Sequence, residues 1–129
     1  METLKAKGKK VYLLSNAQRI FTENELNMFD LTKCFDGVLI SSDHECSKPD
    51  VNYYNALINK YNLEKAETIM IGNDPVSDIK GAKEAGISCL FIPDALGEKY
   101  KKQNEDGKKL ADYSIMNGDF TKIIELTVK

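Results

Sequence analysis

Polar side chains follow several short apolar runs in this 129-residue sequence, and together they could bind a phosphate group and a metal ion. Ser15 and Asn16 follow the first run, Lys48 lies in the loop after the second, and Asp74 and Asp78 follow the third. A hydroxyl and backbone amides hold phosphate oxygens, an ammonium group neutralises them, and carboxylates supply the oxygen ligands that Mg²⁺ prefers. The sequence therefore predicts a phosphate and Mg²⁺ site wherever these three segments meet.

The spacing of Asp74 and Asp78 supports two interpretations. If Asp74 opens a helix, Asp78 lies one turn further on, and the i, i+4 spacing lets both carboxylates approach one point. One or two carboxylates are enough for Mg²⁺, which keeps several of its waters. In the other interpretation Asp74 is only an N-cap, with Pro75 in the first helical position, and Asp78 is only a first-turn carboxylate stabilised by the helix dipole.

Short apolar runs alternate with helical patterns, which indicates one α/β domain over residues 1–129 with a mostly parallel sheet. Ligands of such sheets bind beyond the carboxyl ends of the strands, where the polar residues above are expected. The first strand is expected to be buried on both faces. A capping box of Thr22 and Glu25 predicts a helix start at Thr22. The expected strands are 11–14, 38–40, 69–71, 89–92 and 114–116; the expected helices are 2–7, one from Thr22, one after Asp50, 75–85 and 120–126, with a loop or weak helix over 94–112.

The composition does not favour nucleic-acid binding, membrane association or a disulfide-bonded fold. Eighteen basic and twenty acidic residues give a net charge of −2, which does not favour binding to nucleic acid or to an anionic membrane. No apolar run approaches the ~20 residues that a membrane helix needs, and residues 1–10 lack the apolar core of a signal peptide. Three widely spaced cysteines fit reduced thiols in the cytoplasm better than disulfides or a zinc site.

Three segments in order resemble motifs of the haloacid-dehalogenase-like (HAD) hydrolase superfamily. Residues 11–16 (VYLLSN) resemble its second motif, an apolar strand that ends in Ser or Thr, and residues 47–50 (SKPD) resemble the third, with its lysine. Residues 71–82 (IGNDPVSDIKGA), running on to Ile87, are similar to the fourth, acidic motif. The resemblance covers about residues 4–93, and the long fourth motif is its most specific part.

The resemblance implies a Rossmann-like three-layer sandwich and Mg²⁺-dependent hydrolysis of phosphate esters of small substrates. In the superfamily, an aspartate of a first motif (DxDxT) attacks phosphorus and forms an aspartyl-phosphate, and a second aspartate is the general acid and base. Carried over, Ser15 and Asn16 would bind the transferring phosphoryl group, and Lys48 would neutralise the nucleophile and the phosphate. Asp74 and Asp78 would hold Mg²⁺ directly or through water.

Two departures from the family pattern matter. Asn73 stands where many relatives have the first acid of the fourth motif; we expect Asp74 to face the metal because it carries charge. No DxDxT pattern precedes Ser15, and the cap insertion that determines specificity in relatives is missing too. Asp36, in a sequence that resembles part of a first motif, is expected to form only the turn into the second strand. We therefore expect negligible phosphatase turnover from this chain alone, because removing a covalent nucleophile can cost a factor of about 10⁶.

The missing first motif has a structural consequence. In the family its strand lies centrally, between the strands that here end at Ser15 and Ile71. About five buried side chains at ~1.5–3 kcal/mol each would be lost, a total comparable to the ~5–15 kcal/mol stability of a domain. Direct pairing of the flanking strands, segment exchange with a second copy, or another polypeptide would close the gap. Of these we expect a homodimer with segment exchange, or a rearranged sheet.

The resemblance indicates the C-terminal part of the core domain of a longer HAD-like phosphohydrolase, and two other function classes remain open. A degenerate, non-catalytic HAD-like module would bind a partner or metal without chemistry. A phosphoacceptor receiver-type domain also combines an α/β fold with carboxylates, a hydroxyl and a lysine, but its acidic pair comes first in the chain, whereas Asp74 and Asp78 follow Ser15 and Lys48.

Overall fold

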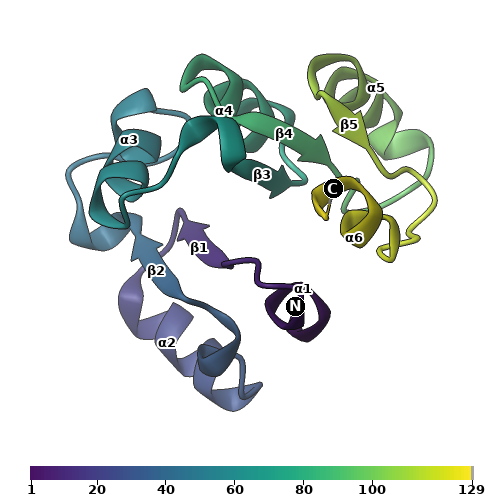
Figure 1. Cartoon of the computed structure of the whole chain (residues 1–129). Helices are drawn as coiled ribbons and strands as arrows, with labels where there is room; N and C mark the ends of the chain where they lie inside the picture. The colour runs from purple at the N-terminus through teal and green to yellow at the C-terminus, as the bar shows by residue number, and fades with distance from the viewer. Residues whose placement is uncertain (129) are drawn as a thin grey trace.

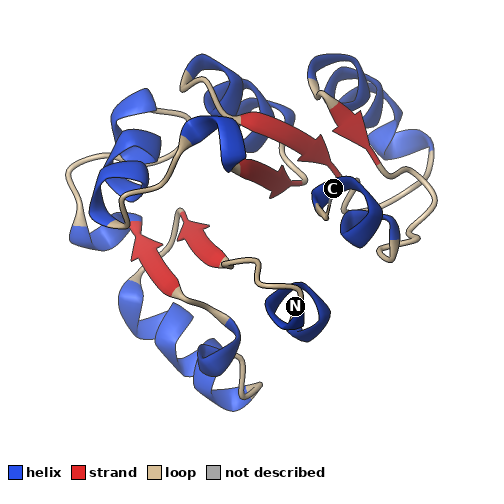
Figure 2. Cartoon of the chain, viewed as in Figure 1, coloured by secondary structure: helices blue, strands red, loops and turns tan. Residues whose placement is uncertain are grey.

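The computed structural model describes residues 1–128, in which short strands alternate with helices (Figure 2). The strands are β1 (Tyr12–Ser15), β2 (Gly37–Ile40), β3 (Ile69–Gly72), β4 (Ser88–Phe91) and β5 (Tyr113–Ser114). The α-helices are α1 (Glu2–Ala6), α2 (Arg19–Met28), α3 (Val51–Lys60), α4 (Gly81–Glu84), α5 (Lys101–Leu110) and α6 (Lys122–Thr127), and a π-helix (Pro75–Lys80) runs into α4. Over the residues described, no helix has the length and apolar character needed to cross a lipid bilayer.

The strands form two separate parallel sheets. One contains β1 and β2, and the other has the order β3–β4–β5. The edges of β1 and β3 face each other across the middle of the molecule (Figure 1) and are not hydrogen-bonded to each other. The expected α/β fold without its central strand is thus confirmed, and the expected alternative of direct pairing between the flanking strands is wrong for residues 1–128.

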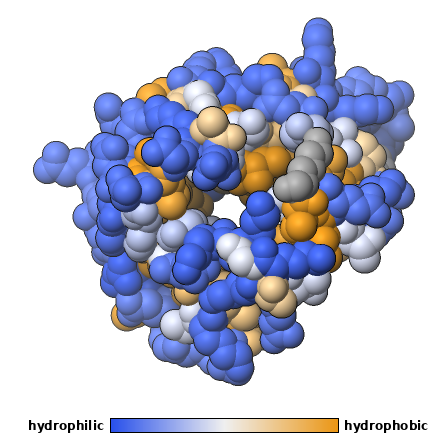
Figure 3. Space-filling model, in the orientation of Figure 1, coloured by the Kyte–Doolittle hydropathy of each residue, from blue (hydrophilic) through white to orange (hydrophobic). Residues whose placement is uncertain are grey.

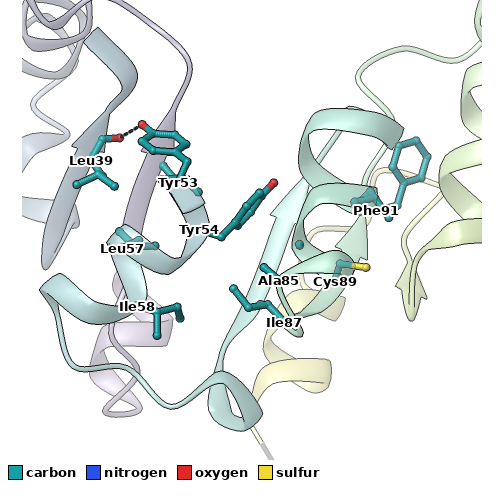
Figure 4. Packing of buried hydrophobic residues seen from close by; sticks show 12 residues of the cluster. Leu39, Tyr53, Tyr54, Leu57, Ile58, Ala85, Ile87, Cys89 and Phe91 are labelled. Atoms are coloured by element: carbon teal, nitrogen blue, oxygen red, sulfur yellow. Dashed lines mark hydrogen bonds between the residues drawn. The ribbon is translucent and has the colours of Figure 1, made fainter. Parts of the chain in front are cut away.

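Helix α3 and the segment from the π-helix to β4 form the main hydrophobic core (Figure 4). Tyr53 and Tyr54 are fully buried at the start of α3, with exposed fractions of 0% and 1%. Tyr54 extends toward the π-helix and α4, and it lies so close to them that a Cβ added at Gly81 would be 2.8 Å from its ring. The remaining members of the cluster that are buried are Leu14, Leu39, Leu57, Ile58, Ile79, Ala82, Ala85, Ile87, Cys89 and Phe91.

The strands beside the gap are less buried than their sequences predict. Ile71 on β3 is 37% exposed, whereas Leu90, its partner on β4, is fully buried. On β1 only Leu14 is buried. The expectation that the first strand is buried on both faces is therefore wrong, because β1 has a neighbouring strand on one side only.

Most helix positions agree with the sequence, but the start of α2 does not. The helix begins at Arg19 instead of at Thr22, and Thr22 is buried within it. The backbone N–H of Arg19 donates to Ser42 Oγ (3.0 Å), so a side chain from the loop after β2 caps the first turn. Residues 94–112 contain a full helix, α5, and the fourth and fifth strands lie one residue before their expected positions.

Tyr53 ties α3 to both strands of the first sheet. Its hydroxyl hydrogen-bonds to the carbonyls of Ser15 (2.8 Å) and Leu39 (3.1 Å). Replacing Tyr53 by Phe leaves these carbonyls without their donor, and we expect a loss of about 1–3 kcal/mol in the free energy of unfolding. Urea denaturation measures it. Tyr100→Phe is the control, expected to change stability by less than about 0.5 kcal/mol; equal effects of the two variants would show that the Tyr53 hydrogen bonds do not stabilise the fold.

The Asp112 carboxylate joins β5 to β4 and α4. It accepts hydrogen bonds from the backbone N–H of Cys89 (2.9 Å) and from Lys83 Nζ (3.1 Å). The hydrogen bond from Cys89 is the main cause that lowers the pKa of Asp112, and Lys83 adds to it against the opposing effect of burial.

This lowered pKa makes part of the stability depend on pH. The contribution is fully present above the unfolded-state pKa of about 3.9 and is lost as the pH falls through the lower folded-state pKa. Asp112→Asn is therefore expected to be less stable than the native chain at neutral pH, and the difference should shrink as the pH falls below about 4. Denaturation curves from pH 7 to pH 2 measure it; a difference independent of pH would contradict the assignment.

Candidate functional site

Asn16 connects the end of β1 to the loop before α3. Its side-chain amide donates to the carbonyl of Lys48, and its side-chain oxygen accepts the backbone N–H of Lys48, both at 2.8 Å. Two hydrogen bonds to one residue fix the position of the Lys48 backbone relative to β1. The Lys48–Pro49 peptide bond is cis.

Lys48 reaches from this loop to the helical segment after β3. Its Nζ lies 2.6 Å from Asp78 Oδ1, and the two side chains are only 12% and 7% exposed. The structure therefore brings the three predicted segments together through Asn16, Lys48 and Asp78. A long lysine side chain in a loop is most often solvated, so its burial is a tertiary effect that the sequence does not show.

The second carboxylate oxygen of Asp78 accepts two backbone hydrogen bonds, from the N–H groups of Asn73 (3.0 Å) and Asp74 (3.1 Å). Gly72 leaves the room for this contact, since a Cβ at that position would lie 2.3 Å from Asp78 Oδ2. With Lys48 on one oxygen and two amides on the other, the buried charge of Asp78 is compensated on both sides.

Asp74 is an N-cap, as one interpretation of its spacing predicts. Its Oδ1 accepts the backbone N–H groups of Val76 (2.8 Å) and Ser77 (2.7 Å), and Pro75 follows in the first helical position. Burial acts to raise the pKa of Asp74, but the hydrogen bonds from Ser77 and Val76 outweigh it, and the pKa is lowered. Oδ1 is thus occupied, and Oδ2 is the oxygen of Asp74 that remains for a ligand.

The turn that carries Asp78 is a π-helix. The backbone N–H of Ile79 reaches back five residues to the carbonyl of Asp74 (3.1 Å). The Tyr54 hydroxyl of α3 hydrogen-bonds to the carbonyls of Ser77 and Asp78 in this turn. Single turns of π-helix are frequent at functional sites, and here the wide turn lies between the two candidate metal ligands.

Ser15 lies at the carboxyl end of β1 and is partly buried. Its carbonyl accepts the Tyr53 hydroxyl, which fixes the backbone beside Asn16. Within residues 1–128, no hydrogen bond connects the Ser15 hydroxyl to Lys48, Asp74 or Asp78. The structure thus places Ser15 beside the residue that holds the Lys48 backbone, at the strand end where a phosphate ligand is expected.

The two candidate metal ligands differ in their surroundings. Both oxygens of Asp78 already have partners, whereas Asp74 has one oxygen available. Across the part of the chain that the structure describes, no group of three or more His, Cys, Asp or Glu side chains is arranged to hold a metal ion. Mg²⁺ takes one or two protein carboxylates and completes its shell with water, so the donor chemistry of Asp74 is compatible with this ion.

A pocket of about 550 Å³ adjoins the site on the side of the first sheet. It lies between the loops after β1 and β2, and Asn16 belongs both to its wall and to the contact with Lys48. Arg19, at the start of α2, donates hydrogen bonds to Asp43 in the loop after β2 and to Glu23 on its own helix. The other lining residues are Ala17, Gln18, Ser41, Ser42, His44, Glu45, Cys46 and Ser47.

Two positioning residues are not apparent from the sequence as parts of the site. The spacing of Tyr53 and Tyr54 predicts packing alone, yet their hydroxyls hold the backbone at Ser15 and at Asp78. A buried tyrosine hydroxyl nearly always finds a hydrogen-bond partner, and this is the signal that identifies them. Burial raises the pKa of Tyr53 to about 12, so its hydroxyl remains a donor at neutral pH.

Comparison with known sequences shows which family and which proteins this chain resembles. The family model of the haloacid dehalogenase-like hydrolases matches residues 1–92. The glyceraldehyde 3-phosphate phosphatase of Methanocaldococcus jannaschii is 30% identical over 112 residues, which are 87% of this chain and 47% of that protein. The pyrophosphatase PpaX of Halalkalibacterium halodurans is 32% identical over 104 residues, 80% of this chain and 48% of that protein. The chain spans about half the length of these relatives.

Solved structures share the fold. A HAD phosphatase from Thermococcus onnurineus superposes with a TM-score of 0.80 at 22% identity, covering 98% of this chain and 54% of that one. A predicted phosphoglycolate phosphatase from Haemophilus somnus gives a TM-score of 0.82 at 22% identity, covering 98% and 53%. The Rossmann-like fold is therefore shown, with part of its sheet present.

We expect substitutions of Lys48 and Asp78 to have strongly coupled effects on the free energy of unfolding. Lys48→Met or Asp78→Asn alone leaves a buried charge without its partner and should cost about 3–5 kcal/mol. The double variant should cost less than the sum of the two, because it removes both charges. Denaturant unfolding of all four proteins measures this coupling.

The matched control is the exposed pair of Lys80 and Glu84, whose side chains are 59% and 52% exposed. The cycle of Lys80→Met and Glu84→Gln should give a coupling of about 0–1 kcal/mol. Equal coupling in both cycles would refute the special role of the buried pair.

Proposed function

The chain belongs to the haloacid dehalogenase-like hydrolase family, and from this premise we propose that residues 1–129 form the phosphate- and metal-binding part of a Mg²⁺-dependent phosphohydrolase. The single observation that carries the proposal is the hydrogen-bonded series Asn16–Lys48–Asp78, which gathers three segments of the chain at the carboxyl ends of β1 and β3. The phosphatase names of the relatives support an enzyme over a module without chemistry.

Ser15, Asn16 and Lys48 have distinct roles in this proposal. The Ser15 hydroxyl donates to an oxygen of the phosphoryl group, and the Lys48 ammonium neutralises its charge. Asn16 orients Lys48, because both of its side-chain hydrogen bonds go to the Lys48 backbone. Asp78 holds the Lys48 ammonium in place, so the cation is positioned before a ligand arrives.

Asp74 and Asp78 are the proposed metal ligands. Asp74 would hold Mg²⁺ directly through Oδ2, and Asp78, whose oxygens have partners, would act through water. When bound, Mg²⁺ would stabilise the negative charge on the phosphoryl oxygens while phosphorus exchanges its bond to the leaving oxygen for a bond to the nucleophile. The lowered pKa of Asp74 keeps its carboxylate ionised and able to bind a cation at neutral pH.

The carboxylates of Asp74 and Asp78 have structural partners, and we therefore do not assign either of them as the nucleophile. Asp74 caps the π-helix, and Asp78 is buried under Lys48. Asp36, in the sequence that resembles part of a first motif, accepts the backbone N–H of Val11 at the far end of the sheet and forms the turn into β2, as expected. We therefore propose that residues 1–129 alone bind phosphate but give negligible turnover of phosphate esters.

The proposed substrate is a small phosphorylated compound. The open pocket beside Asn16 includes three serines among its lining residues, and its volume of about 550 Å³ lies within the range of small-ligand sites. A net charge of −2 does not favour nucleic acid or an anionic membrane as the ligand. The thiols of Cys34, Cys46 and Cys89 are free, which fits the reducing conditions of the cytoplasm.

Titration of the chain with inorganic phosphate in the presence of Mg²⁺ tests this proposal. Ser15→Ala should weaken the affinity about five- to tenfold, since one hydrogen bond to a charged group is lost. Ser88→Ala is the matched control, because Ser88 is exposed at the amino end of β4, away from the site. Removal of Mg²⁺ with a chelator should weaken phosphate binding as well.

Three outcomes would contradict the proposal. Phosphate binding that is absent at millimolar concentration, or equal in the two serine variants, would reject the site. Robust hydrolysis of p-nitrophenyl phosphate by the pure chain, abolished by Asp74→Ala, would show that these residues already include a nucleophile.

A further inference from the structure

Helix α2 and the residue after it expose several large apolar side chains. Four of the eleven large apolar residues that are exposed in the described part of the chain lie here: Ile20, Phe21, Met28 and Phe29, each 63–74% exposed. By contrast, the face of the molecule shown in Figure 3 is mostly hydrophilic outside its central hollow. Large apolar side chains that gather at one place on a surface mark a site of interaction.

The exposed apolar residues lie on the side of α2 that points away from the rest of the molecule. Thr22 and Leu26, one turn apart, are the buried residues of this helix. Ile20, Asn24 and Met28 are also spaced by four residues, and at 100° per residue they lie about 180° from the buried side. In Figure 1, α2 lies at the lower edge of the view, next to β2. We call the side that carries these residues, together with Phe21 and Phe29, the outer face of α2.

The outer face of α2 has the composition of a contact between proteins. None of the chain's lysines lies between Lys10 and Lys33. The charge of Arg19, at the start of the helix, is paired with Glu23 and Asp43. Aromatic residues and Met are enriched in protein interfaces, and Lys is depleted. A helix that lies on a membrane typically carries Lys and Arg beside its apolar side, so this composition favours a protein partner over a lipid surface.

We propose that the outer face of α2 binds a second copy of this chain, with the two α2 helices antiparallel about a two-fold axis beside Asn24. Ile20 lies four residues before Asn24 and Met28 lies four residues after it, so the axis places each Met28 against Ile20 of the other copy. Phe21, Ile20 and Asn24 then form the hole into which the Met28 side chain of the other copy packs. This inference rests on the surface of α2 and goes beyond the proposed phosphatase chemistry.

Asn24 makes this contact self-complementary. Beside the two-fold axis, each Asn24 carboxamide lies opposite its counterpart, and each supplies both an N–H donor and an oxygen acceptor. The two amides therefore satisfy each other, and a single Asn among apolar residues fixes the register of two packed helices. The antiparallel direction also brings the positive end of each helix dipole beside the negative end of the other.

The exposed apolar area is sufficient for a weak dimer. A large side chain such as Phe buries about 150–250 Å² when it is fully covered. Because the four apolar residues of the outer face are about two-thirds exposed, the two copies together would bury roughly 800–1,200 Å². This is the size of the smaller specific interfaces between proteins. We therefore expect a monomer–dimer equilibrium with a dissociation constant on the order of 10 µM.

Sedimentation equilibrium of the native chain from about 1 to 500 µM tests the proposal, with a mostly monomeric state expected at the lowest concentration and a mostly dimeric state at the highest. Phe21→Glu places a charge in the apolar contact and should weaken dimerisation at least about tenfold. Phe120→Glu is the matched control, because Phe120 lies outside α2 and is exposed to a similar degree, 60% against 63%. Its dissociation constant should equal that of the native chain. Circular dichroism checks that each variant folds.

Disulfide cross-linking tests the orientation of the two helices. Packed helices lie about 8–10 Å apart and a Cα atom lies about 2.3 Å from its helix axis, so two Cα atoms beside the two-fold axis approach to about 4–6 Å. A disulfide spans this distance, and Asn24→Cys should form a covalent dimer on oxidation. Ile20→Cys is the control, because it lies about 12 Å from its counterpart along the helices and should cross-link no more than the native chain. The native chain, with its own free cysteines, is oxidised in parallel.

Several results would overturn the proposal. A native chain that is monomeric at about 500 µM would show that the outer face does not bind a second copy. Equal dissociation constants for Phe21→Glu and Phe120→Glu would place the dimer contact elsewhere on the molecule. Equal cross-linking of Asn24→Cys and Ile20→Cys would contradict the antiparallel arrangement, and this comparison decides the question even where Phe21→Glu does not fold. Binding of the monomer to anionic lipid vesicles that Phe21→Glu abolishes would assign the outer face to a membrane.

Discussion

The arrangement of the molecule depends on one buried ion pair between its two half-sheets. Among the ion pairs of residues 1–128, only Lys48–Asp78 joins the part of the chain around β1 and β2 to the part around β3, β4 and β5. Removing two charges from water is costly, and the pair is tolerable because the remaining carboxylate oxygen accepts two backbone N–H groups. The half-sheets are thus held relative to each other by this ion pair and by the core around α3, where other sheets have a ladder of hydrogen bonds.

Helix α3 gives this pair its support. Tyr53 anchors the helix to the first half-sheet through Ser15 and Leu39, and Tyr54, the next residue, anchors it to the π-helix of the second. Adjacent residues of a helix point about 100° apart, so one helix can contact both halves. The same residues that join the halves also surround the proposed phosphate site. Stability and binding therefore share side chains, as is common where a functional site lies between structural units.

The sequence predicts those parts that depend on local chemistry. The apolar runs predict the strands to within one or two residues, and Asp50 and Asp74 cap their helices as their types indicate. The start of α2 is missed because its cap is Ser42, a residue from another loop. The sequence does not predict the π-helix or the burial of Lys48 either. Both involve contacts between Asp78 and residues far from it in the sequence, Tyr54 for the π-helix and Lys48 itself.

The sequence of β3, which lies beside the gap between the two sheets, is typical of a strand in a more buried environment than residues 1–128 supply. Ile69, Met70 and Ile71 form a continuous apolar run, the pattern of a strand covered on both sides, yet all three are at least partly exposed. On β4, where neighbouring strands lie on both sides, the apolar residues Cys89, Leu90 and Phe91 are fully buried. Each square ångström of apolar surface left in water costs about 25 cal/mol, so the exposed run on β3 is a free-energy penalty that a further strand would remove. The difference in burial between two adjacent strands of similar composition thus follows from the number of their neighbours, one for β3 and two for β4 within the described residues.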